Sequence, residues 1–125
     1  MTPYDENSFS PPAPVALVII RVPNSAPSIA DVPMLIDSGA DVTLIPNAPV
    51  EFLRIAADTE DVYQLQGFDG SISESQAVRA DLVFGRRTFK GRFLVVDRPY
   101  GILGRDVLNH LTITLDGPNL AWEAP

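Results

Sequence analysis

The chain has 125 residues, of which 46% are hydrophobic and 20% charged, and these proportions predict one folded domain with a modest core. Its net charge of −7 argues against a nucleic-acid partner or an anionic membrane surface, because both require clustered Lys and Arg. Without cysteine, and with His110 as the one histidine, the sequence offers no disulfide framework or thiolate metal site, so we expect neither metal nor cofactor.

The residues before position 15 differ in composition from the rest. Residues 1–14 carry Pro, Ser, Asn and acidic side chains with almost no apolar periodicity. This composition predicts a flexible Pro-rich arm with little fixed structure, followed by a domain over residues 15–125. The arm lacks the basic start of a signal peptide, and the longest apolar run, Val15 to Ile20, is far shorter than the roughly 20 residues of a membrane span. We therefore expect a cytoplasmic protein with no membrane partner.

From Val15 onward, short runs rich in β-branched residues alternate with turn residues, which is typical of an all-β domain. Tight turns are expected at Asp69–Gly70 and Gly85–Arg86, and a longer reversal at 116–119, so the sheet is expected to be antiparallel. The predicted strands cover residues 15–22, 32–37, 42–45, 62–68, 72–84, 88–96, 102–103, 111–115 and 120–122.

Two stretches could be helical. Residues 49–57 begin with a proline, which the first turn of a helix tolerates. In residues 105–111, the apolar side chains of Val107, Leu108 and Leu111 recur at helical spacing. The second stretch is the more convincing helix.

The most informative segment runs from Pro33 to Pro46 and reads PMLIDSGADVTLIP. An apolar strand leads into Asp37, and Ser38-Gly39 then breaks the extended chain, so the carboxylate is expected at a tight turn. Two carboxyl groups that face one water can hydrolyse a peptide bond, because one takes a proton from the water while its protonated twin polarises the carbonyl. The chain has one such segment, so the twin must come from a second copy through a two-fold axis.

Residues 35–41, LIDSGAD, resemble the active-site signature of the retropepsin-like (retroviral-type) aspartic proteases, closest to stand-alone cellular and bacterial members. Residues 101–108, GILGRDVL, resemble the family's apolar-apolar-Gly element and the helix that follows it. The hairpin at 64–73, QLQGFDGSIS, lies where the family has its flap. The resemblance covers residues 15–122 and implies a small closed antiparallel β-barrel with one short C-terminal helix and a flap hairpin.

The resemblance also implies a homodimeric aspartic endopeptidase that acts on peptide or protein substrates, with Asp37 as the catalytic acid and base. Ser38 would form a hydrogen bond across the two-fold axis, and Arg105 would form an ion pair with Asp41 of its own chain. The residues that support the active-site loop would be Ser38, Gly39, Ala40, Asp41 and Arg105. The flap tip would close over the substrate and exclude water; it would consist of Gly67, Phe68, Asp69, Gly70 and Ser71.

Other interpretations remain open. An isolated Asp-Ser-Gly is more often an ordinary turn, although the flanking apolar residues and the distant GILGRDVL favour an active site. The same fold could serve as a catalytically silent peptide-binding or dimerisation module. A monomeric β-barrel adaptor with Asp37 in an ordinary turn is a third alternative. We interpret Asp106 and His110 as structural residues, and Trp122 as either a core residue or a dimer contact.

Overall fold

The computed structural model describes residues 1–66 and 70–125, and strands dominate it. In chain order the elements are β1 (Thr2–Pro3), β2 (Val15–Arg21), β3 (Ser28–Ile36), β4 (Leu44–Pro46), α1 (Asn47–Phe52), β5 (Ala57–Gln66), β6 (Ile72–Phe84), β7 (Arg87–Val96), β8 (Gly101–Leu103), α2 (Arg105–Leu108), β9 (Thr114–Asp116) and β10 (Ala121–Glu123). The all-β prediction is confirmed, and the strand boundaries differ from the expected ones by a few residues.

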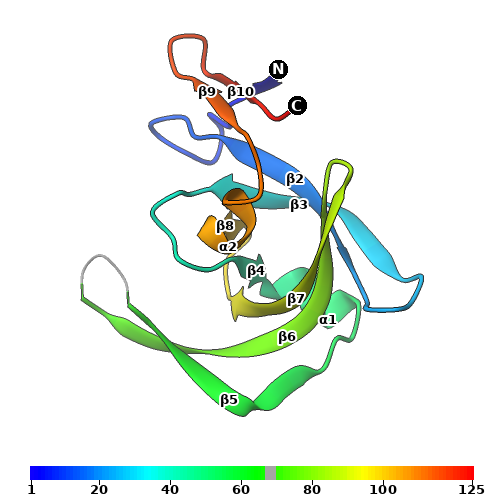
Figure 1. Cartoon of the computed structure of the whole chain (residues 1–125). Coiled ribbons are helices and arrows are strands. Elements are labelled where there is room, and N and C mark those ends of the chain that lie inside the picture. Colours follow the sequence, from blue (N-terminus) through cyan, green and yellow to red (C-terminus); the bar gives the residue numbers. More distant parts are fainter. Residues whose placement is uncertain (67–69) are drawn as a thin grey trace.

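The larger sheet closes on itself. Its strands follow the order β2-β3-β8-β4-β7-β6-β5, and β2 also pairs with β6, which makes a barrel (Figure 1). Gly85 and Arg86 form the expected tight turn between β6 and β7, where Gly85 has a φ of +59°. The pairs β3–β8 and β4–β7 are parallel, which corrects the expectation of an entirely antiparallel sheet. Turn residues indicate only how consecutive strands are joined. They therefore could not predict the parallel pairing of strands that are distant in the sequence.

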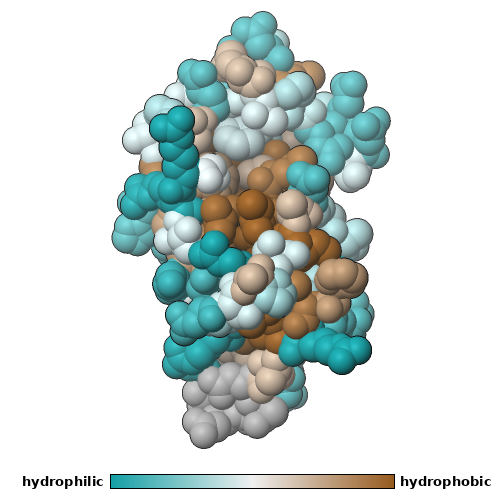
Figure 2. Space-filling model, turned by 90° about the vertical axis from the view of Figure 1, so that its right-hand side faces the viewer, coloured by the Kyte–Doolittle hydropathy of each residue, from teal (hydrophilic) through white to brown (hydrophobic). Residues whose placement is uncertain are grey.

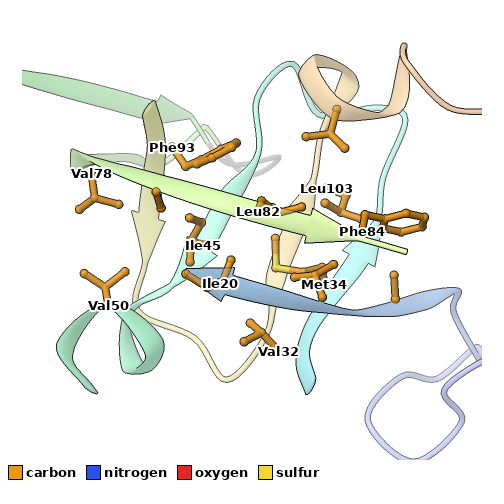
Figure 3. Packing of buried hydrophobic residues seen from close by; sticks show 14 of the residues in the cluster. Ile20, Val32, Met34, Ile45, Val50, Val78, Leu82, Phe84, Phe93 and Leu103 are labelled. Carbon is orange, nitrogen blue, oxygen red and sulfur yellow. The ribbon is translucent and has the colours of Figure 1, made fainter. Parts of the chain in front are cut away.

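The alternation of side chains along β2 explains how the barrel is filled. Val18 and Ile20 are almost completely buried, whereas Leu17 and Ile19 between them are exposed. Successive side chains of a strand point to opposite faces, so β2 sends every second residue into the barrel. There they meet buried side chains from β3, β6 and β8 (Figure 3). The core therefore lies inside the barrel, and β3 contributes Val32 and Met34 to it.

The outside of the barrel also carries apolar residues. Figure 2 shows them gathered in the middle of one face and framed by hydrophilic ones. Phe52, the last residue of α1, has an exposed fraction of 73%. A single exposed apolar residue is common on soluble proteins, so Phe52 carries no functional assignment.

Both predicted helices form, and both are shorter than expected. α1 covers Asn47–Phe52 rather than 49–57, and α2 covers Arg105–Leu108 rather than 105–111. The chain leaves α1 at Arg54, which has a left-handed φ of +56°. After α2, the backbone N–H groups of His110 and Leu111 still donate to carbonyls three residues earlier, so the helix continues only as tight turns.

The two ends of the chain meet in a separate sheet with the strand order β1-β10-β9. Thr2 pairs with Trp122, and Asp5 and Ala13 form a further bridge. We expected little fixed structure in residues 1–14, whereas backbone hydrogen bonds hold this segment at both places. A two-residue strand and a single bridge leave no periodic pattern in a sequence, which is why composition alone missed them.

Candidate active site

Asp37 directly follows β3, where the chain leaves the sheet. The last strand residue, Ile36, donates its backbone N–H to the carbonyl of Pro14 at 3.0 Å, and Asp37 N–H donates to the carbonyl of Leu103 at 3.1 Å. A tight turn follows, in which Ala40 N–H donates to the carbonyl of Asp37 at 3.1 Å. The chain at Asp37 is therefore fixed by the residue before β2, which bonds to Ile36, by Leu103 of β8 and by its own turn.

The turn also orients the carboxylate of Asp37. Its Oδ1 accepts the backbone N–H of Gly39 at 2.9 Å, and the side chain is half-buried. A Cβ atom on Gly39 would lie 3.1 Å from that same oxygen, so a larger residue would crowd the carboxylate. Ser38 and Gly39 themselves are exposed. The candidate catalytic group is therefore oriented from within the chain and open on one side.

Arg105 joins this loop to the start of α2. Its Nη1 donates to the carbonyl of Ser38 at 2.8 Å, and its Nη2 contacts Oδ1 of Asp41. We call the contact between Arg105 and Asp41 the outer ion pair. The two side chains are 43% and 82% exposed, so the pair forms as expected but is not buried in the single chain. In the single chain the loop lies at the surface, and water reaches both charges.

A second connection lies deeper, and the sequence did not reveal it. The hydroxyl of the fully buried Thr43 donates to Oδ1 of Asp106 at 2.6 Å and accepts the N–H of Gly104 at 3.0 Å. The other carboxylate oxygen of Asp106 accepts Thr43 N–H at 3.1 Å. We call Thr43, Gly104 and Asp106 the inner hydrogen-bond cluster. A polar residue inside the apolar run VTLIP was the one available signal, since a buried hydroxyl needs partners.

Gly104 brings the two segments close enough for this cluster to form. A Cβ atom at this position would lie 2.5 Å from the carbonyl carbon and oxygen of Val42. Real side chains do not approach a backbone so closely, so only glycine fits without displacing one of the two segments. The second glycine of the GILGRDVL motif is therefore required by the close contact between the start of α2 and Val42 at the end of the Asp37 loop.

An apolar row runs away from Asp37 across four strands. Leu35 pairs with Ile102, Ile102 with Leu44, and Leu44 with Leu94. All four are half-buried, and none belongs to the core or to the residues packed against it, so they line the outside of the barrel. Leu35 stands two positions before Asp37, so the row begins close to the candidate catalytic residue. Sequence reasoning missed this row, because β8 and β4 join distant parts of the chain.

The structure describes only part of the hairpin that was predicted to form the flap. β5 and β6 form a hairpin whose last described pair is Gln66 with Ile72 (Figure 1). Gly70 has a φ of +82°, as a tight turn requires, and both Gly70 and Ser71 are exposed. The other predicted tip residues, Gly67, Phe68 and Asp69, lie outside the described residues.

The remaining candidates lie apart from this loop. The carbonyl of His110 accepts a hydrogen bond from Nη1 of Arg87, and its ring lies near Phe89. Trp122 is 7% exposed and packs beside Phe84, which makes it a core residue.

Two further features concern ligands and membranes. No group of three His, Asp or Glu side chains in the described part of the chain could hold a metal ion. In the same residues, no helix has the length and apolarity to span a membrane.

Comparisons with known proteins agree with this geometry. Residues 12–116 match the family model of the retroviral aspartyl protease. The solved structure of EIAV protease complexed with the inhibitor HBY-793 matches with a TM-score of 0.59 and 28% sequence identity, over 78% of this chain and 86% of that chain. No curated protein matches the sequence. The chain belongs to the retroviral aspartyl protease family.

Proposed function

We propose that two copies of this chain form a homodimeric aspartic endopeptidase whose active site lies between the two Asp37 side chains. The observation that carries the proposal is the setting of Asp37: its carboxylate is oriented by Gly39 N–H and borders the exposed residues Ser38 and Gly39. The chain contains one such loop, so a single copy supplies half of a two-carboxylate site. A two-fold axis beside Ser38 and Gly39 would supply the other half.

The chemistry requires one proton shared by the two carboxyl groups. The ionised Asp37 takes a proton from a water molecule, and the oxygen of that water forms a bond to the scissile carbonyl carbon. The protonated Asp37 of the other copy gives its proton to the carbonyl oxygen, which yields a neutral tetrahedral diol. The Asp37 that took the water proton then gives it to the amide nitrogen, while the other, now ionised, Asp37 accepts a proton from a hydroxyl of the diol. The C–N bond breaks, the carbonyl re-forms as a carboxylic acid, and the pair again holds one shared proton.

The surroundings of Asp37 indicate what kind of peptide would bind. The apolar row of Leu35, Ile102, Leu44 and Leu94 offers no charge and no strong hydrogen-bond partner from its side chains. Burying apolar side chains against such a surface is favourable by roughly 25 cal/mol per Å². We therefore propose extended peptides with apolar residues near the scissile bond as substrates, held under the flap that residues 67–71 would form.

The decisive test is the variant Asp37→Asn. Asparagine keeps the size and the hydrogen bond to Gly39 N–H but cannot exchange a proton, so we expect a folded dimer with no cleavage of a mixed peptide library. Asp31→Asn is the matched control, because Asp31 lies on the same strand, is exposed, and has a φ of +57° that asparagine tolerates. Mass spectrometry of the peptide products measures cleavage. Sedimentation of the protein shows whether the dimer forms. Retained turnover in Asp37→Asn would refute the proposal.

The pH dependence provides an independent test. Because the pair works with one shared proton, activity is expected to fall at low pH, where both carboxyl groups are protonated, and at high pH, where both are ionised. Measuring kcat/KM across the whole pH range should give a bell-shaped curve. Activity that is constant on both sides would contradict a two-carboxylate mechanism.

The alternatives make different predictions in the same experiments. A silent peptide-binding module would bind a peptide-like aspartic protease inhibitor and dimerise, yet cleave nothing. A monomeric adaptor would sediment at the monomer mass even at high concentration.

A further inference from the structure

An open cleft lies beside the turn between β2 and β3. It has a volume of about 570 Å³, and charged side chains from β2, β6 and β7 line it together with polar residues of the turn. β3 begins at Ser28, which lines the cleft, and ends at Ile36, directly before Asp37. The nine residues of this strand span roughly 25–30 Å, so the cleft and Asp37 lie at opposite ends of β3. In Figure 1 the turn lies at the right and the loop after β3 at the left.

A buried carboxylate fixes one wall of the cleft. Asp81 of β6 pairs with Arg21 of β2 and with Lys90 of β7, so the three charged residues are neighbours across three strands. Ala80 and Leu82 belong to the core, so Asp81 between them points to the outside of the barrel, yet it is only 2% exposed. Its Oδ2 accepts Nε and Nη2 of Arg21 at 3.2 and 3.1 Å. A buried carboxylate needs such a partner, and the two bonds hold the guanidinium in one orientation.

The positive charge at the cleft exceeds what Asp81 neutralises. Nη1 of Arg21 takes no part in the bonds to Asp81, and the Arg21 side chain is 35% exposed. Lys90 makes no hydrogen bond or ion pair with the described part of the chain. Two cations against one carboxylate leave a net positive charge at the cleft, in a chain whose net charge is −7. Positive charge gathered in a cleft attracts anions, so the cleft is suited to an anionic ligand.

The turn is ordered and adds hydroxyl groups to the cleft. Val22 N–H donates to the carbonyl of Pro27 at 3.0 Å, and Ser25 N–H donates to the carbonyl of Val22 at 3.3 Å. Between them, Asn24 has a left-handed φ of +55°, which asparagine tolerates. Ser25 and Ser28 both line the cleft and are exposed, and a serine hydroxyl can donate to an anionic oxygen. The polar groups around the cleft are therefore held in place before any ligand binds.

We infer that this cleft binds a small organic oxyanion, a molecule that carries a carboxylate or a phosphate group. Nη1 of Arg21 and the ammonium group of Lys90 would each donate to an oxygen of that group, and the turn hydroxyls would add weaker bonds. The volume of about 570 Å³ lies within the range of roughly 300–1,000 Å³ that small-molecule sites occupy, so the rest of the molecule has room. The cleft lies away from Asp37 and is complete in one chain, so this role is separate from the proposed function.

The test titrates the full chain with sodium phosphate and with sodium citrate, which carry the two candidate groups. Sodium chloride at the same ionic strength is the salt control. Binding is followed through the backbone amide signals in two-dimensional NMR spectra. We expect saturable shifts at Ser25, Ala26 and Ser28 with at least one probe and none with chloride. A response to phosphate alone would assign a phosphate ligand, and a response to citrate alone a carboxylate. No saturable shift with either probe would overturn the inference.

The variant Lys90→Gln separates a built site from general attraction of anions. It removes one cation and leaves the bonds between Arg21 and Asp81 in place, so we expect the Kd to rise about tenfold, the effect of one charge-assisted hydrogen bond. Lys90→Arg keeps the charge and should retain most of the affinity. Arg86→Gln is the matched control, because it removes the same charge from an exposed turn residue that does not line the cleft. An equal rise in Kd for Lys90→Gln and Arg86→Gln, or no rise for either, would refute the site.

Discussion

The inner hydrogen-bond cluster and the outer ion pair both connect the Asp37 loop to the segment around α2, but they lie in different surroundings. Thr43 in the inner cluster is fully buried, whereas the Asp41 side chain in the outer pair is 82% exposed. Water and salt screen an exposed pair, so it contributes little to stability. A buried hydroxyl that is removed leaves its partners without hydrogen bonds, which is costly. The comparison predicts that the inner hydrogen-bond cluster contributes more to holding the loop than the outer ion pair does.

The largest effect is expected for Gly104→Ala. The new methyl group would lie 2.5 Å from the backbone of Val42 and would push the inner cluster apart, so we expect a loss of about 3 kcal/mol in the free energy of unfolding. Gly91→Ala on β7 is the matched control, because its Cβ would meet nothing within 4 Å. Urea unfolding of both variants measures the difference. Equal stabilities would show that the close contact at Gly104 is not a constraint.

A smaller loss is expected for Thr43→Val, which preserves shape and removes the hydroxyl. The carboxylate of Asp106 and the N–H of Gly104 would each lose a partner, so we expect a loss of about 2–3 kcal/mol in the same measurement. Thr88→Val, at an exposed position of β7, should change stability by no more than about 0.5 kcal/mol. If the two valine variants were equally stable, the inner cluster would not be the stronger connection.

The smallest effect is expected for Asp41→Asn in the monomeric protein. An exposed pair predicts a loss below about 1 kcal/mol that disappears in high salt, whereas a buried pair would cost about 3–5 kcal/mol. Urea unfolding of wild-type protein and Asp41→Asn is then measured at low and at high protein concentration, because a dimer forms more readily at high concentration. If a partner copy covers the outer pair, the loss should be larger at high concentration; the same small loss at both would place the pair outside the dimer interface.

Local patterns in the sequence were enough to predict the strands and the candidate catalytic acid. β2 shows the two-residue alternation of a half-buried strand, and the tight turn at Gly85–Arg86 forms where turn residues indicated it. The position of Asp37 at the end of an apolar strand also follows from the sequence. Each of these features depends on residues that are neighbours in the chain, which is why a sequence pattern can carry them.

The features of the candidate site that failed to appear in the sequence all involve residues far apart in the chain. The hydroxyl of Thr43 finds its partners about sixty residues later, at Gly104 and Asp106. The apolar row depends on the parallel pairs of β3 with β8 and β4 with β7. The exposure of the outer ion pair depends on how the whole loop lies on the surface. No local rule encodes such contacts, because they arise only when the barrel closes.

The wide sequence separation of these contacts has a kinetic consequence. The loop around Asp37 is 61 to 67 residues away from the groups that hold it at Gly104, Arg105 and Asp106. Contacts between residues so far apart in the sequence form slowly, because the chain must close a long loop before these contacts stabilise it. A nascent or refolding chain would therefore assemble its β2–β3 hairpin early and order the turn at Asp37 late. Competence for peptide hydrolysis would be among the final properties to emerge.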